Sequence, residues 1–205
     1  RQPQLQSWPK NRVRTCNTHR VSVLNRSRIT DIELAPAGHL AIDWAQRHSP
    51  LVDGFLRERL SDGALNGKRV AVVVHLEAKT AFLATVLADA GAQVVVAGSN
   101  PHSTRDEIAA ALVEQGIEVH STRDSGYEAW EKDLASVAAS GPELIVDDGG
   151  DATLLIHKGY ELEHGDKWVE SDSGNMEEAV IKNLLKNVHK KETNHWTEVV
   201  KDWKG

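Results

Sequence analysis

Three carboxylates and two glycines lie within five residues of this sequence, in the run Asp147-Asp148-Gly149-Gly150-Asp151. Carboxylates this close repel one another, so we expect at least one of them to have a raised pKa or a cationic partner. The glycines allow a ligand to approach the backbone closely. A carboxylate with a raised pKa can exchange protons near neutral pH. An acidic turn that caps the next helix is the alternative, and spacing alone leaves both interpretations open.

Two other polar segments also follow apolar runs. One comprises His75, Glu77, Lys79 and Thr80, and the other spans residues 98–103 and includes Asn100. A histidine at such a position is a candidate for proton transfer, although histidines at strand ends also serve as structural residues. The segment after His75 contains no glycine, so it lacks the glycine-rich fingerprint of a dinucleotide-binding turn. The ten histidines show no ligand spacing, and we predict no metal site.

The apolar runs before these segments alternate with helical patterns. Stretches typical of strands buried in a parallel sheet occur at Arg69–Leu76, Gln93–Ser99, Ile117–Ser121 and Glu143–Asp148. Helices are predicted between them at Lys79–Ala90, from a capping box at Thr104–Glu107 to Gln115, and at Tyr127–Ala139. The predicted fold class is therefore α/β, with a doubly wound, mostly parallel sheet and helices on both faces. Because ligands bind beyond the carboxyl ends of such strands, the three polar segments should converge on one rim.

Two segments flank this α/β pattern. Residues 1–30 hold seven of the 24 Lys and Arg residues and no acid, which favours a basic, disordered extension over a transit peptide or a nucleic-acid-binding arm. Leu40 and Trp44 mark one face of a helix in the stretch that follows. After residue 158, two amphipathic patterns predict a C-terminal helical hairpin, with Trp196 and Trp203 packed in a core. We therefore divide the chain into an extension at 1–30, an α/β substrate-binding domain at 31–158 and a helical insertion at 159–205.

Composition excludes several classes of protein. The 205 residues carry a formal charge of −6, and because residues 1–30 are basic the remainder is strongly acidic, which argues against a nucleic-acid partner. The longest apolar stretch is interrupted by Asp89 and Gln93, so no membrane span is predicted. The single cysteine, Cys16, excludes an internal disulfide framework and suits a reducing, cytoplasmic compartment.

Residues 31–158 resemble the N-terminal substrate-binding domain of the adenosylhomocysteinase (S-adenosylhomocysteine hydrolase) family. The matching pieces are Asp31–Ala35, Leu65–Arg69, His75 with Thr80-Ala81, Asn100 with Ser103-Thr104 and Asp106, and Asp147–Thr153 with His157. The resemblance implies hydrolysis of S-adenosyl-L-homocysteine to adenosine and homocysteine, through NAD-dependent oxidation of the ribose 3′-hydroxyl and elimination. It also implies a small-molecule substrate and homo-oligomers of the full-length protein. We expect the NAD-binding domain of the family to be absent from this chain.

The resemblance further implies roles for individual residues. Asp148 matches the catalytic aspartate beside the ribose, and His75 matches the histidine that handles protons near the 5′ leaving group. The implied substrate-binding residues are Glu77, Lys79, Thr80 and Asn100.

Two of these positions depart from the pattern of the family, which commonly has Thr in place of Glu77 and Glu in place of Lys79. Lysine only donates hydrogen bonds, whereas the usual Glu accepts one from the adenine amino group. If Lys79 reaches the same ring edge, it would favour a 6-oxo base such as hypoxanthine. The interpretation that we favour over this one is that Glu77 takes over the amino contact and Lys79 only neutralises it. Two alternative functions for this chain are also considered. It could be a nucleoside-binding module or truncated paralogue without turnover, or it could be a phosphoacceptor domain. The last would need an acidic pair where this chain has His75.

Overall fold

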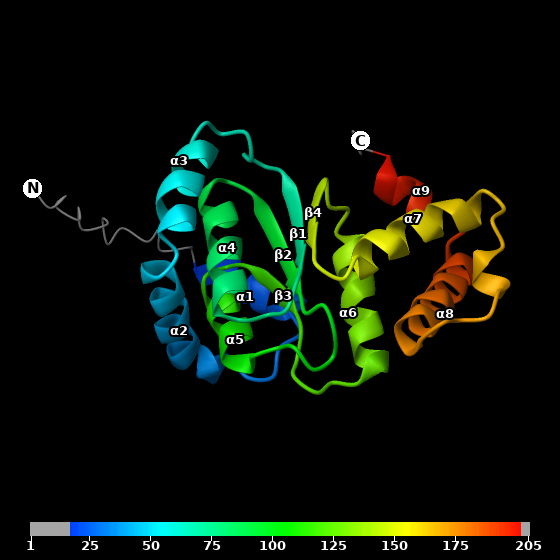
Figure 1. The fold of residues 1–205 in the computed structure, drawn as a ribbon, viewed down its shortest axis with the longest axis horizontal. Helices are drawn as coiled ribbons and strands as arrows, with labels where there is room; N and C mark the ends of the chain where they lie inside the picture. Colours follow the sequence, from blue (N-terminus) through cyan, green and yellow to red (C-terminus); the bar gives the residue numbers. More distant parts are fainter. Residues whose placement is uncertain (1–16, 202–205) are drawn as a thin grey trace, which may run out of the picture.

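A fully parallel, four-stranded sheet forms the centre of the molecule (Figure 1), with the strand order β3-β2-β1-β4. The structure, a computed structural model, describes residues 17–201, with side chains from residue 21 onward. The strands are β1 (Arg69–Val73), β2 (Gln93–Ala97), β3 (Glu118–His120) and β4 (Leu144–Asp147). The predicted α/β class is confirmed. Each strand is shorter than predicted, because regular pairing with a neighbouring strand covers only these residues.

Helices cover both faces of the sheet, one group on each side in Figure 1. The first group comprises α1 (Asn17–Arg26), the 3-10 turn η1 (Ile32–Leu34), α2 (Ala35–Arg47), the π-helical segment η2 (Leu51–Leu56), α3 (Arg57–Leu60), α4 (Ala78–Asp89) and α5 (Asp106–Glu114). The second comprises α6 (Tyr127–Ala139), α7 (Asp151–Glu163), the 3-10 turn η3 (Trp168–Glu170), α8 (Met176–Lys191) and α9 (His195–Val200). Val70 and Val72 of β1 pack with the first group, whereas Ala71 and Val73 pack with the second. Because side chains alternate along a strand, two covered faces require this continuous apolar run.

The C-terminal helices belong to the core of the second face. Ile181 and Leu185 of α8 and Trp196 of α9 are almost fully buried in the same cluster as the β1 side chains. Core packing of Trp196 is therefore confirmed, while Trp203 lies outside the described residues. The helix α7 continues across residue 158, so the boundary that we drew there falls inside a helix.

The last part of the basic N-terminal segment is folded. Val23 of α1 is 1% exposed and packs in the core of the first face. Arg28 extends the edge of the sheet, since its backbone accepts a hydrogen bond from Ser121 and donates one to Val119. Its guanidinium also pairs with Asp133 of α6, with 2.5 Å from Nε to Oδ1. Residues 17–30 therefore differ from the disordered extension expected from composition, because these tertiary contacts hold them. Residues 1–16 lie outside the described part.

The helical face that Leu40 and Trp44 mark is exposed, at 72% and 51% respectively. The buried side of α2 is instead lined by small residues and one isoleucine, namely Ala35, Gly38, Ile42 and Ala45. A Cβ added to Gly38 would lie 1.9 Å from the backbone oxygen of Glu107 in α5. This close approach of two helices selects small residues for the contact and leaves the larger ones outside.

The predicted capping box at Thr104–Glu107 is wrong. The helix α5 begins at Asp106, and its N-cap residue, Arg105, makes no side-chain capping bond. The hydroxyl of Thr104 is buried and instead bonds to the hydroxyl of Ser121. A tertiary partner thus competes with the local cap for the same hydroxyl, which the local sequence pattern does not reveal. None of the helices in residues 17–201 is long and apolar enough to cross a membrane.

Candidate active site

The order of the strands places a topological switch point between β1 and β4, and the edge at the carboxyl ends of these two strands is referred to as the crevice. The chain runs from β1 outward to β2 and β3, and then returns to place β4 on the other side of β1. At such a switch point the loops leave the two neighbouring strands in opposite directions, and ligands bind between them. The backbone N–H of Asp148 donates to the carbonyl of Val73 at 3.2 Å, and the N–H of His75 donates to Oδ2 of Asp148 at 3.4 Å. His75 and Asp148 therefore lie side by side at the carboxyl edge.

The adjacent Asp147 and Asp148 have different surroundings. Oδ1 of Asp147 accepts a hydrogen bond from the N–H of Gly150 at 3.0 Å, and its Oδ2 accepts from both the N–H and the hydroxyl of Thr153 at 2.9 Å. Asp147 thus holds the turn and the start of α7, as the capping interpretation of this run predicts. Asp148 is exposed, and among the described residues its carboxylate accepts only the His75 bond. Of these two carboxylates, Asp148 is the one with oxygens left for a ligand.

The third carboxylate of the run, Asp151, is half-buried at the start of α7. Burial, together with the negative charges of Asp147, Glu177 and Asp148, raises the pKa of Asp151 from 3.8 to about 6. The predicted raised pKa within this run is therefore confirmed. Glu177 comes from the start of α8 and accepts a hydrogen bond from the hydroxyl of Tyr127 at 3.0 Å. Sequence reasoning missed this residue, because only the packing of α8 brings its charge close to Asp151.

His75 is held by its backbone and by its ring. Its carbonyl accepts hydrogen bonds from the N–H of Glu77 at 2.9 Å and from the hydroxyl of Thr80 at 2.7 Å. Thr80, a predicted substrate-binding residue, is buried and uses its hydroxyl for this contact. The ring nitrogen Nδ1 lies 3.2 Å from the hydroxyl of Ser99 and 3.5 Å from the amide nitrogen of Asn100. Ser99 belongs to the polar segment that we expected at this rim but was not among the predicted substrate-binding residues, and its position next to Asn100 at the end of β2 is the signal that could have found it.

Glu77 and Lys79 lie in the turn and first helical residues after β1. Glu77 is at the N-cap of α4 but makes no capping bond through its side chain, and Lys79 is exposed. Neither side chain forms a hydrogen bond or an ion pair with any other described residue. Glu77 and Lys79 therefore form no ion pair with each other, and the exposed ammonium group of Lys79 has no partner among the described residues.

The turn between β1 and α4 does not fit a dinucleotide. Binding of a pyrophosphate at a helix N-terminus needs free backbone N–H groups and glycines that let the phosphate approach. Residues 75–79 contain no glycine, and the carboxylate of Glu77 at the N-cap would repel the phosphate. Among the described residues, no group of three or more His, Cys, Asp or Glu side chains could hold a metal ion.

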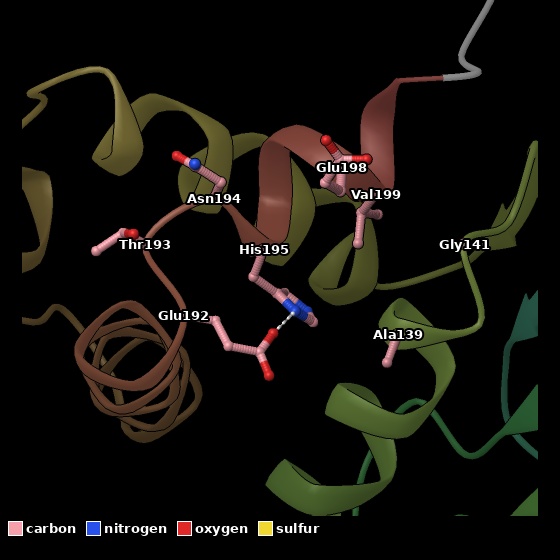
Figure 2. A pocket seen from close by; sticks show the side chains of 8 residues that line it. All are labelled: Ala139, Gly141, Glu192, Thr193, Asn194, His195, Glu198 and Val199. Atoms are coloured by element: carbon pink, nitrogen blue, oxygen red, sulfur yellow. Dashed lines mark hydrogen bonds and ion pairs between the residues drawn. The ribbon is translucent and has the colours of Figure 1, made fainter.

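A surface hollow of about 550 Å³ lies elsewhere, between the end of α6 and the start of α9 (Figure 2). Its lining includes Gly141, which precedes β4, and the hydrogen-bonded pair His195 and Glu192, with 2.9 Å from Nδ1 to Oε2. This position is at the amino end of β4, whereas ligands of parallel sheets bind at the carboxyl ends. The candidate site is therefore the crevice of His75 and Asp148.

The structure is thus an α/β domain with a doubly wound sheet, and it places the imidazole of His75 and the carboxylate of Asp148 at the switch point, where ligands bind in folds of this class. The family model of S-adenosyl-L-homocysteine hydrolase matches residues 26–205, and the chain belongs to this family. The S-inosyl-L-homocysteine hydrolase of Methanococcus maripaludis is 44% identical over 131 residues, which are 64% of this chain and 32% of that relative. The match thus spans about a third of the length of this curated relative.

Proposed function

We propose that this chain forms the substrate-binding part of an enzyme that hydrolyses the thioether between a purine nucleoside and homocysteine. Membership of the S-adenosyl-L-homocysteine hydrolase family supports this, as does the similarity to an S-inosyl-L-homocysteine hydrolase. The observation that carries the proposal is the hydrogen bond from the backbone N–H of His75 to the carboxylate of Asp148, at the edge of the sheet where ligands of parallel sheets bind. The proposal includes a cytoplasmic location and a homo-oligomeric full-length enzyme.

Within this proposal, Asp148 takes up a proton from the ribose and His75 acts at the 5′ side, where the sulfur leaves. Asp148 suits this role because its oxygens are exposed, whereas those of Asp147 are committed to α7. The family resemblance implies NAD, which supplies hydride chemistry when bound. Because the turn after β1 does not fit a dinucleotide, we propose that NAD binds to another part of the complete enzyme.

Two single substitutions in the complete enzyme test the choice of carboxylate. Asp148→Asn removes the base but not the shape, so we expect turnover to fall about 10²–10⁴-fold with little change in unfolding free energy. Asp147→Asn weakens the hydrogen bonds to Thr153, so we expect a loss of about 1 kcal/mol in stability and a much smaller loss of turnover. Turnover and urea unfolding are measured on both variants. If Asp147→Asn is inactive and Asp148→Asn retains wild-type turnover, the assignment is wrong.

We further propose that the preferred substrate carries a 6-oxo base, as in S-inosyl-L-homocysteine. The ammonium group of Lys79 donates hydrogen bonds only, which suits the O6 atom of hypoxanthine and opposes the amino group of adenine. The absence of an ion pair between Lys79 and Glu77 within the described residues leaves those donors for a ligand. The name of the Methanococcus maripaludis relative points to the same base.

Competition between S-inosyl- and S-adenosyl-homocysteine on the complete enzyme tests this preference. When a bound ligand covers the ammonium group of Lys79, a donor left opposite this donor costs about 1–3 kcal/mol, which corresponds to roughly a ten- to hundredfold preference. We expect the ratio of kcat/KM values to favour the inosyl substrate and to shift towards the adenosyl substrate in Lys79→Glu. Lys132→Glu makes the same change of charge on the exposed surface of α6 and is the matched control. An unchanged ratio in Lys79→Glu refutes the role of this lysine.

A further inference from the structure

The two ring nitrogens of His75 have different surroundings. Nδ1 faces the loop after β2, where the hydroxyl of Ser99 and the amide nitrogen of Asn100 lie 3.2 Å and 3.5 Å away. Nε2 makes no hydrogen bond to any described residue, and the side chain is exposed at the crevice. Nε2 is therefore the ring nitrogen that is open to a ligand in the crevice, while residues of the protein determine the protonation state of Nδ1.

The orientation of the Asn100 amide determines whether Nδ1 of His75 can carry a proton. Its oxygen accepts a hydrogen bond from the backbone N–H of His102 at 2.9 Å, in the short turn that asparagine side chains form with the residue two positions on. Because an N–H can only donate, the amide oxygen must face His102 and the amide NH2 group must face His75. The NH2 group also only donates, so its partner Nδ1 has to be the unprotonated nitrogen. The Ser99 hydroxyl donates or accepts as required and is compatible with this state.

We propose that Asn100, together with Ser99, is a positioning residue that holds the neutral His75 ring with its proton on Nε2. The tautomer of a histidine is set by the hydrogen bond at its other ring nitrogen, and here both neighbours of Nδ1 can donate. The proposal rests on two contacts of the Asn100 amide: the N–H of His102 fixes its orientation, and its nitrogen lies next to Nδ1 of His75.

The loop that carries these two residues is itself fixed. The N–H of Gly98 donates to the hydroxyl of Ser121 at 3.1 Å, and its carbonyl accepts from the indole N–H of Trp130 at 3.0 Å. A Cβ added to Gly98 would come within 2.8 Å of the hydroxyls of Ser121 and Thr104. Fully paired, buried groups of this kind are rigid, so the loop can impose its geometry on the exposed ring of His75.

This inference rests on the proposed function. It makes Asp148 a hydrogen-bond acceptor and His75 a hydrogen-bond donor towards a ligand. Asp148 presents acceptor oxygens, and the neutral His75 presents the Nε2–H donor. His75 therefore stabilises an electron-rich atom of the ligand, whereas the removal of a proton belongs to Asp148. Whether or not the chain acts on a nucleoside thioether, the tautomer is a property of these residues and is measured separately.

Nitrogen-15 NMR of the 205-residue chain, at a pH where the ring is neutral, measures the tautomer directly. In the wild-type chain we expect Nδ1 to resonate as an unprotonated nitrogen and Nε2 as a protonated one. Asn100→Asp keeps the acceptor for His102 but places a carboxylate at Nδ1, so we expect the proton to move to Nδ1. An alanine substitution is less informative, because an isolated neutral imidazole already prefers the proton on Nε2.

Asp124→Asn is the matched control, since Asp124 bonds to His102 in the same loop but does not contact His75. It should leave the His75 resonances in the wild-type pattern, and amide spectra of all variants should show the fold retained. A proton on Nδ1 in the wild-type chain would overturn the proposal. So would an unchanged His75 pattern in a folded Asn100→Asp variant. Neither result would bear on the proposed thioether hydrolysis, which is tested by turnover.

Discussion

Replacement of Asp151 by asparagine should stabilise the protein at neutral pH and have no effect in acid. The folded-state pKa of Asp151 is raised from 3.8 to about 6 by burial and by the charges of Asp147, Glu177 and Asp148. The native state therefore binds more protons than the unfolded state between pH 4 and 6. Stability falls as the pH rises through this window, and the penalty persists above it. Asparagine has the same shape and carries no charge, so it avoids this penalty.

The expected gain follows from the size of the pKa difference. A change from 3.8 to about 6 corresponds to about 3 kcal/mol, at about 1.4 kcal/mol for each unit. Asp151 is only half-buried, and solvent screening reduces the effect to about 1–2 kcal/mol. No hydrogen bond of the Asp151 side chain to another described residue has to be broken, so little of this gain should be offset.

Urea unfolding at pH 4 and at pH 7.5 measures the effect on the 205-residue chain. We expect Asp151→Asn to raise the free energy of unfolding by about 1–2 kcal/mol at pH 7.5 and by almost nothing at pH 4. Asp43→Asn, at an exposed position of α2, makes the same chemical change and should have little effect at either pH. An equal effect of Asp151→Asn at both pH values, or a loss of stability at pH 7.5, would refute the reasoning.

Two other substitutions test tertiary contacts, one a close packing contact and the other a buried ion pair. Gly159→Ala places a methyl group 2.3 Å from the indole of α9, so it should cost about 1–3 kcal/mol in urea unfolding, whereas Gly54→Ala meets open space and should cost much less. Similar losses at both glycines would contradict the close contact. Arg28→Ala leaves the buried carboxylate of Asp133 without its cation and should cost about 3 kcal/mol at pH 7.5, against less than about 1 kcal/mol for the exposed Arg26→Ala. Because burial raises the pKa of Asp133, the Arg28→Ala loss should be smaller at pH 4, and a loss that grows in acid would refute the pairing.

Much of the fold follows from local sequence patterns. The continuous apolar runs at β1 and β2 predict strands covered on both faces, and the helix Tyr127–Ala139 has the predicted bounds. These predictions succeed because strand burial and helix periodicity depend on residues close together in the chain. Local patterns fail at Thr104, whose hydroxyl bonds to Ser121, and at Leu40 and Trp44, which α2 leaves exposed. In both places a contact with a distant segment competes with the local preference.

The sequence alone also placed His75 and Asp148 at the ends of two strands, and the carboxyl-end rule for parallel sheets predicts that they share a rim. It could not show that β4 lies directly beside β1, because strand order depends on which side of the sheet each crossover passes. Nor could it distinguish Asp147 from Asp148, since the two are adjacent and chemically identical. Only the tertiary structure commits Asp147 to α7, brings Glu177 to Asp151 and turns the amide of Asn100 towards His75. Local sequence encodes the elements, but the partners of each charge and each hydrogen-bonding atom are set by segments that meet only in the folded chain.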